Sequence, residues 1–278
     1  MKCFFNLSAH LVTFLFFFVI IMIFIAYYAN NNLIFLLKMN EFIYLIVGGG
    51  RLASQLQHYF SLKNIAYNTW KRQDKDDLQS LVVQSDIVLL AISDDAIEPF
   101  WRHHQLHNKT CVHFSGALHV EGIFSFHPLM TFGHTLYSLE QLESILFVHH
   151  EQSSSFQSIF PSLPNLSIQI KAEQQAYYHA LCVIANNFTT LLWQKFFHEM
   201  ESTFKAPAEP LHLYLQQTCD NLNLDYKTAL TGPLCRHDTQ TISRNLQALS
   251  ADPIQEIYQS FIDYYQEISH LSMNKDTS

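Results

Sequence analysis

The sequence predicts an α/β fold followed by an all-helical C-terminal region. Three observations favour this fold class. Short apolar runs alternate with amphipathic or polar stretches up to about residue 170, a glycine triplet directly follows the first run, and long helical patterns fill the rest. Strands that alternate with helices pair in parallel through right-handed crossovers. We therefore expect a sheet domain over residues 39–170 and a helical domain over residues 171–278.

The first apolar run, FIYLIV, is rich in aromatic and β-branched residues, as expected for a strand buried on both faces. The pattern predicts strands over residues 42–47, 65–70, 86–92, 110–114, 145–149 and 166–170. Between the early strands it predicts helices over residues 52–62, 74–84 and 96–106. The sheet domain should thus hold six strands.

Helical spacing dominates after residue 171. A long helix is expected over residues 172–201, with Val183 and Asn187 on one face. Prolines at positions 207 and 210 break this pattern, because proline does not continue a helix. Further helices are predicted over residues 211–222, 239–249 and 253–271.

Residues 1–38 differ from the rest of the chain. The run over residues 11–29 carries no charge and is about as long as the roughly 20 residues of a membrane-spanning helix. Three interpretations remain: a start codon assigned too far upstream, so that the segment is a false extension; a genuine membrane anchor; or a signal peptide. We favour the first, in which translation starts at Met39 and the protein is cytoplasmic; the second makes it membrane-anchored.

Composition narrows the function classes. The net charge is −8 with only 16 Lys and Arg, so no nucleic-acid-binding surface is expected, and partners should be small molecules or further copies of the chain. Five widely spaced cysteines without a C-x-x-C pair fit neither a disulfide framework nor a zinc site. The histidines show no coherent ligand spacing, and we expect no metal.

The residues Gly48, Gly49, Gly50, Arg51, Leu52 and Ala53 match the pattern G-x-G-x-x-A. The first glycine permits a tight turn, the second lets the backbone approach a pyrophosphate, and the small Ala53 allows close helix–strand packing. The new helix directs free N–H groups and its positive dipole end at the phosphates. In its strand–turn–helix context the motif predicts a Rossmann-type dinucleotide-binding domain.

The end of the second strand indicates which dinucleotide binds. An NAD site carries Asp or Glu there for the ribose hydroxyls, whereas this chain has Lys71 and Arg72. Two cations suit a 2′-phosphate, so we expect NADP rather than NAD. The alternative is that both cations belong to an ordinary solvated loop.

The third strand ends in Ile92, Ser93 and Asp94, at the sheet edge where ligands of this architecture lie. We expect these residues to line the cofactor cleft. The alternative for Asp94 and Asp95 is that they only cap the following helix.

Six stretches resemble bacterial Rossmann-like proteins with the domain of unknown function DUF2520: LIVGGGRLA, DIVLLAISDDAI, VHFSGAL, FSFHPLMTF, YHALCVIANNF and LTGPLCRHD. That family is similar in turn to pyrroline-carboxylate reductases, hydroxyacid dehydrogenases and deazaflavin-dependent NADP reductases. The resemblance implies a fold and an NADP cofactor but no particular substrate.

Two candidate catalytic residues lie near the sheet edge. Similar Ser-Gly turns hold substrate carboxylates in the hydroxyacid dehydrogenases, which implies such a role for Ser115; the alternative is a plain strand-ending turn. His127 lies in a segment expected to pass over the same cleft and could donate a proton near neutral pH. A structural histidine is the alternative.

The first long helix carries further candidates. His179, Val183 and Asn186 are spaced to share one face. Hydroxyacid dehydrogenases place a catalytic lysine where this chain has Val183, so their mechanism does not transfer, although His179 could replace the proton donor. The alternative for the asparagines is that they bridge helices.

Two functions follow from these features. One is an NADP-dependent oxidoreductase that acts on a small carbonyl, imine or hydroxy-acid substrate. The other is a non-catalytic NADP-binding sensor or partner protein, which the missing lysine favours, because a fold alone does not establish catalysis. The resembling reductases commonly dimerise through their helical domain, and we expect a homodimer here.

Overall fold

The computed structural model describes residues 42–151 and 153–275, and the side chains up to residue 269. The chain divides into two compact units that meet at Thr190 and Leu191. The uncharged run at residues 11–29, and with it every interpretation of residues 1–38, lies outside the described part. Among the described helices, none combines the length and apolar character that crossing a membrane requires.

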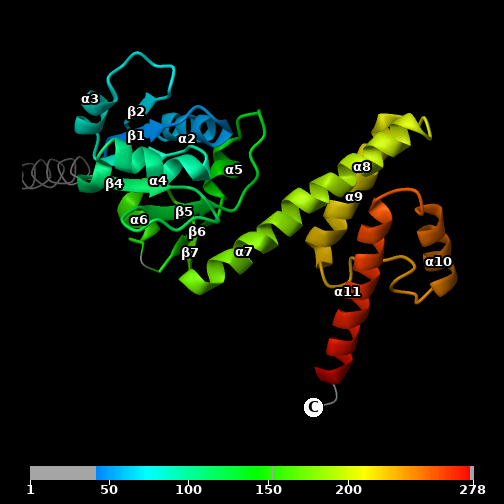
Figure 1. The fold of residues 1–278 in the computed structure, drawn as a ribbon. Coiled ribbons are helices and arrows are strands. Elements are labelled where there is room, and N and C mark those ends of the chain that lie inside the picture. Colours follow the sequence, from blue (N-terminus) through cyan, green and yellow to red (C-terminus); the bar gives the residue numbers. More distant parts are fainter. Residues whose placement is uncertain (1–41, 152, 276–278) are drawn as a thin grey trace, which may run out of the picture. The chain divides into compact units, whose positions relative to one another are not determined.

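The first unit is built on a seven-stranded sheet in the order β2-β1-β3-β4-β5-β6-β7 (Figure 1). The strands are β1 (Tyr44–Val47), β2 (Tyr67–Trp70), β3 (Ile87–Leu90), β4 (Thr110–His113), β5 (Phe124–Pro128), β6 (Phe147–His150) and β7 (Ser167–Ile170). Neighbours from β2 through β5 pair in parallel. The predicted α/β class with a Rossmann-type sheet and a helical C-terminal region is confirmed.

The sheet differs from the prediction at β5 and β6. β5 was not predicted, and β6 runs antiparallel to it, so the sheet is only mostly parallel. β5 contains His127 and ends in Pro128, a residue that weakens any strand pattern because it cannot donate to the ladder. The proline is tolerated because it occupies the last position of the strand.

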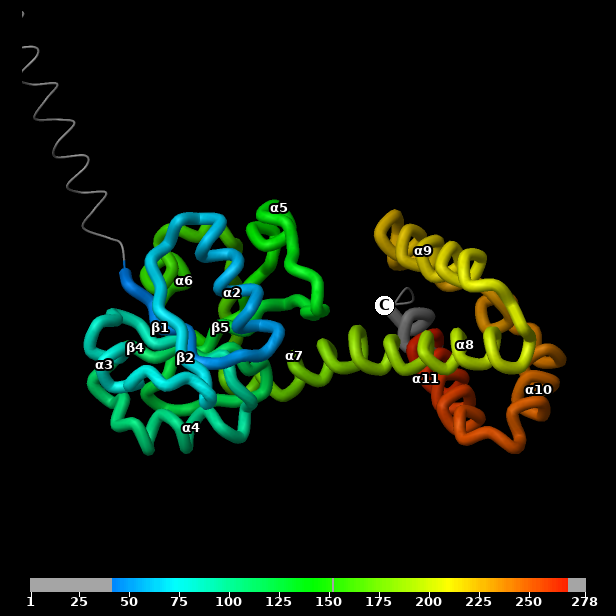
Figure 2. The backbone as a smooth tube through the Cα atoms, turned by 90° about the horizontal axis from the view of Figure 1, so that it is seen from above, coloured from blue at the N-terminus to red at the C-terminus, as the bar shows by residue number. Residues whose placement is uncertain are grey.

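Helices cover both faces of the sheet (Figure 2). α2 (Arg51–Leu62), α5 (Leu139–Glu143) and α6 (Phe156–Ile159) pack on one face, and α3 (Leu78–Val83) and α4 (Asp94–His103) pack on the other. Alternation along β1 explains both layers, because Ile46 faces the first cluster and Val47 the second. The strand is therefore apolar throughout, as a strand buried on both faces must be.

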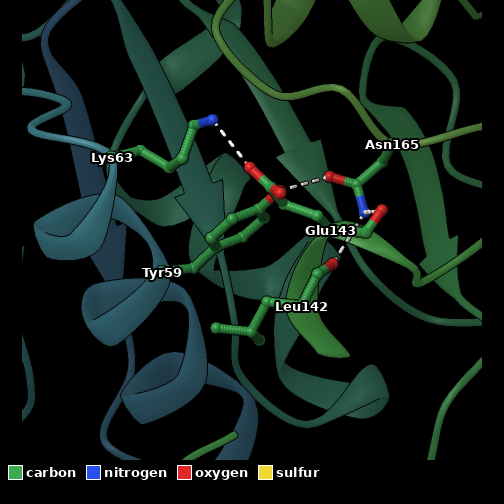
Figure 3. A network of polar contacts seen from close by, with 5 residues as sticks. All are labelled: Tyr59, Lys63, Leu142, Glu143 and Asn165. Atoms are coloured by element: carbon green, nitrogen blue, oxygen red, sulfur yellow. Dashed lines mark hydrogen bonds and ion pairs between the residues drawn. The ribbon is translucent and has the colours of Figure 1, made fainter. Parts of the chain in front are cut away.

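A buried polar network fastens α2 and α5 to the loop before β7 (Figure 3). The fully buried Asn165 donates from Nδ2 to the carbonyl oxygens of Leu142, at 2.8 Å, and Glu143, at 3.2 Å. Its Oδ1 accepts from the Tyr59 hydroxyl at 2.8 Å, and Lys63 forms an ion pair with Glu143 at 2.7 Å. Every polar atom of the asparagine side chain thus has a partner, as burial requires.

The helical region begins with α7 (Gln175–Cys182), which continues through a π-helical segment (Val183–Phe188) into α8 (Thr189–Ser202). α9 (Ala208–Asp225), α10 (Thr239–Ala248) and α11 (Ile254–Lys275) follow. α7 packs with the sheet: Nε2 of Gln175 donates to the carbonyl oxygens of Gly116, at 3.4 Å, and Leu118, at 2.9 Å. The first compact unit, which ends at Thr190, therefore includes α7 as well as the sheet, although the last strand ends at residue 170.

Candidate active site

The glycine turn after β1 requires a glycine at its first position. Gly48 has a φ of +138°, and a Cβ there would lie 2.2 Å from the carbonyl oxygen of Ala91. Any side chain would therefore collide with the backbone that follows β3. Gly50 then precedes α2 and offers no side-chain cap, so the first amides of α2 stay available to a ligand anion.

A pocket of about 930 Å³ opens above this turn. Most of the predicted cofactor-binding residues line it: Gly48, Gly49, Gly50, Arg51, Leu52, Lys71, Arg72, Ile92 and Ser93. Two predicted residues do not. Ala53 is fully buried beneath the turn, where its small side chain permits close packing, and the Asp94 carboxylate is engaged elsewhere.

Three cations surround the glycine turn. Cδ of Lys71 lies 3.5 Å from the Cβ position of Gly49, so the lysine stem crosses over the turn. Arg51 and Arg72 line the same pocket. Among the described residues none of the three forms an ion pair, which leaves their charge available to an anion.

An aromatic cluster that the sequence analysis missed forms another wall. The ring centroids of Trp70 and Phe100 lie 5.8 Å apart, and those of Phe100 and His104 lie 4.4 Å apart. Burial, and next the adjacent His103, lowers the pKa of His104, so this ring favours the neutral form. The wall is therefore uncharged, and its neighbouring rings are tilted at 50° and 49° to each other. The spacing of Phe100 and His104 on one helix face was the only sequence signal.

A second pocket, of about 650 Å³, adjoins the first because Arg51 and Leu52 line both. The predicted catalytic residues His127, His179 and Asn186 line this second pocket. The structure thus brings together side chains that lie far apart in the sequence. Val183 lines it too, with Cys182 and residues 129–132.

The two histidines meet at Gly116. A Cβ on this glycine would lie 2.9 Å from Cδ2 of His179 and 3.0 Å from Nε2 of His127, so a side chain would displace one of the rings. The ring centroids lie 6.4 Å apart. Burial, and next the proximity of His179, lowers the pKa of His127 to about 4. His127 is therefore neutral at pH 7.

The Ser115 hydroxyl is fully engaged within the protein. Its Oγ donates to Oδ2 of Asp94 at 2.5 Å and accepts from the backbone N–H groups of Ala117, at 3.2 Å, and Leu118, at 3.0 Å. Ser115 lies outside the lining of the second pocket. Its hydroxyl therefore shapes the turn that presents Gly116 to the histidines.

The π-helical segment forms part of the second pocket wall through Val183, Ala185, Asn186 and Asn187. A regular helical pattern did not predict it. Nδ2 of Asn186 contacts Oδ1 of Asn187 at 3.4 Å, and both side chains are exposed. Single π-helical turns occur often at functional sites, which fits the position of this one beside a pocket.

Comparison with known proteins identifies a domain within the chain. Residues 148–264, from β6 into α11, match the family described as a domain of unknown function, DUF2520. No curated protein matches the chain.

Solved structures share the fold. A Bacteroides fragilis protein named for a proposed NADP oxidoreductase activity is 20% identical, with a TM-score of 0.64, over 82% of this chain and 98% of that one. A Thermotoga maritima protein whose name states no activity gives 19% identity and a TM-score of 0.60, over 82% and 99%. The imine reductase of Myxococcus stipitatus, solved with NADP+, gives 14% and 0.58, over 82% and 94%. The chain therefore carries a DUF2520 domain at residues 148–264 and has the fold of these three structures.

Proposed function

We propose that this chain is an NADP-dependent oxidoreductase for a small carbonyl, imine or hydroxy-acid substrate. One observation carries the proposal: Arg51 and Leu52 join the pocket above the glycine turn to the pocket that holds His127 and His179. A dinucleotide site and a site with proton-bearing side chains thus share a wall. When bound, the nicotinamide supplies the hydride chemistry that no amino-acid side chain provides.

The residues of the first pocket fit NADP. The clash that any Cβ at Gly48 would cause with the Ala91 carbonyl is typical of the first glycine of this motif, which permits the tight turn below the pyrophosphate. Lys71 and Arg72, which form no ion pair with any described residue, offer positive charge for a 2′-phosphate. Trp70 and Phe100, whose rings are tilted at 50° to each other, offer a ring face on which the adenine can stack. The NADP+ bound to the Myxococcus stipitatus imine reductase supports this assignment.

The residues of the second pocket supply binding and a proton. His127 is neutral at pH 7, so it acts as a hydrogen-bonding group toward a substrate oxygen or nitrogen rather than as an acid. His179, beside it at Gly116, is then the candidate proton donor. The amide of Asn186 can orient the substrate from the π-helical wall.

A second function has one specific observation in its favour. Val183 lines the second pocket, and no lysine among the described residues does. A protein that binds NADP as a sensor or partner, without turnover, would need the first pocket only. The two functions therefore make the same prediction for cofactor binding and different ones for catalysis.

Cofactor binding is tested by calorimetry with NADPH and NADH. We expect NADPH to bind at least about tenfold more tightly, since one charge-assisted contact is worth about 1.4 kcal/mol or more. The double variant Lys71→Ala/Arg72→Ala should lose this preference, whereas Lys75→Ala, a change at an exposed lysine of the same loop outside the pocket lining, should keep it. Equal affinities of the unmodified protein would refute the NADP assignment.

Catalysis is tested by loss of nicotinamide absorbance with a panel of cyclic imines, keto acids and simple ketones. We expect at least one class to be reduced with NADPH. Tight NADPH binding without turnover of any class, and without oxidation of the matching amines and hydroxy acids with NADP+, would support the sensor function instead.

A further inference from the structure

Tyr178 makes a contact that the functions of His127 and His179 leave unexplained. Its hydroxyl lies 2.7 Å from Nδ1 of His127, and the two rings meet nearly edge to face, at 77° with centroids 5.7 Å apart. The tyrosine is half-buried on α7, and His127 lies on β5. This hydrogen bond therefore joins a sheet strand to the helix that carries His179.

The two nitrogens of His127 have different surroundings. Nδ1 is occupied by Tyr178, whereas the Cδ2–Nε2 edge faces Gly116, where His179 also lies. Since His127 and His179 both line the second pocket, Nε2 is the nitrogen that remains for a substrate. A neutral imidazole carries only one N–H. If Nδ1 accepts a hydrogen bond from Tyr178, the ring proton is on Nε2, which can then donate to a substrate; if Nδ1 donates, Nε2 can only accept.

The protonation of both partners is fixed by burial. Burial raises the pKa of the Tyr178 hydroxyl, and the pKa of His127 falls to about 4. Both groups are thus neutral at pH 7, and the contact is a hydrogen bond between a hydroxyl and a neutral imidazole. After burial, Cys182, one turn further along α7, raises the pKa of the Tyr178 hydroxyl as well.

The chemistry of the two neutral groups favours one direction of donation. A phenolic O–H is a stronger acid than the N–H of a neutral imidazole, and an imidazole nitrogen is a better acceptor than a phenolic oxygen. The phenolic proton therefore stays on Tyr178 and is donated to Nδ1 of His127.

We propose that Tyr178 is a positioning residue for His127: its hydroxyl donates to Nδ1 and so keeps the ring proton on Nε2, directed at the second pocket. His127 then presents a hydrogen-bond donor to a substrate carbonyl oxygen or imine nitrogen. Second partners of this kind commonly set the tautomer of a functional histidine. The proposal rests on the proposed oxidoreductase function for its consequence, but not for its test.

The tautomer is measured directly in the full-length protein by nitrogen–proton NMR correlation after selective ¹⁵N labelling of histidine. His127→Gln assigns the ring signals of His127. We expect a single neutral form with the proton on Nε2 in the unmodified protein at pH 7. In Tyr178→Phe we expect the His127 signals to move toward an average of the two neutral forms. Tyr177→Phe, at the adjacent exposed position, is the matched control and should leave them unchanged.

Kinetics give an independent measure. Tyr178→Phe should lower kcat by about tenfold or more, because His127 would no longer be held with its proton directed at the substrate. The Kd for NADPH should stay within about twofold. Tyr178 is outside the lining of the first pocket, which explains the second expectation. In a His127→Gln background the same substitution should have little further effect, since the tyrosine acts through the histidine.

The outcomes separate the two proposals. A proton on Nδ1 in the unmodified protein, or His127 signals that Tyr178→Phe leaves unchanged, would overturn the positioning role; the first of these needs no variant to fold. The expected tautomer in a protein that turns over none of the substrates would leave the positioning role standing and count against the oxidoreductase.

Discussion

The hydroxyl of Ser115 donates to Oδ2 of Asp94 at 2.5 Å, which ties the turn after β4 to the first turn of α4. Ser115→Ala should remove this bond and leave the backbone N–H groups of Ala117 and Leu118 without their acceptor. We expect the free energy of unfolding to fall by about 1–3 kcal/mol. Urea unfolding measures the loss. Ser93→Ala is the control, because that side chain makes no capping hydrogen bond. Equal stability of both variants would contradict the structural role.

His179 is expected to act in the chemical step rather than in cofactor binding. His179→Ala should reduce kcat by roughly 10² or more, while the Kd for NADPH changes little, as expected for loss of a general acid. Steady-state kinetics and calorimetry measure the two quantities. His198→Ala, at an exposed position of α8, is the control. A large loss of NADPH affinity with kcat unchanged would assign His179 to the cofactor instead.

Acid should destabilise the protein through its buried histidines. The pKa of His113 is lowered from 6.5 to about 4, mainly by burial; Asp94 opposes this shift, and nearby His150 and His119 add to it. The fully buried His113 is thus neutral when folded at a pH where it is protonated when unfolded. Its contribution to stability is complete above about pH 6.5 and is lost as the pH falls toward 4, by about 1.4 kcal/mol per pH unit.

His113→Asn isolates this contribution. The backbone N–H of Ser115 donates to Nδ1 of His113, and an asparagine oxygen can accept the same bond. Urea unfolding of the variant should therefore show a shallower fall between pH 6.5 and pH 4.5 than the unmodified protein. Parallel pH profiles would show that His113 does not control acid stability.

We propose a homodimer that forms through α7 and the π-helical segment. Tyr177 and Leu181 on α7 and Ile184 and Phe188 on the π-helical segment are exposed apolar residues, and packing against a second copy would remove this surface from water. Leu181→Glu/Phe188→Glu should convert a dimer to a monomer in sedimentation velocity. Leu166→Glu changes an exposed leucine before β7 and should leave the dimer intact. A monomeric unmodified protein at micromolar concentration would refute the proposal.

The sequence predicted those parts of the fold that can be recognised from a few consecutive residues. β1 is a continuous apolar run, and the glycine turn is a motif between a strand and a helix. β5 lacked such a signal because a histidine and a proline interrupt its pattern, and α5 and α6 span too few residues to show periodicity.

The candidate site divides in the same way. The cations Lys71 and Arg72 were found because they follow a strand at a fixed distance from the glycines. The contact between His127 and Tyr178 was missed because residues so far apart in sequence meet only through the packing of α7 on the sheet. The aromatic wall formed by Trp70 and Phe100 depends likewise on two separate elements.

The π-helical segment at Val183–Phe188 should allow this helix to lose one residue without breaking. In a regular α-helix each residue advances the chain by about 100°, so a deletion rotates everything that follows. A π turn already contains a surplus residue, and deleting one there would restore the regular ladder of hydrogen bonds. Homologous chains that are one residue shorter in this stretch should therefore keep an unbroken helix but turn Asn186 and Asn187 away from the pocket wall. Such a deletion would keep the helix and change only the pocket wall that it forms.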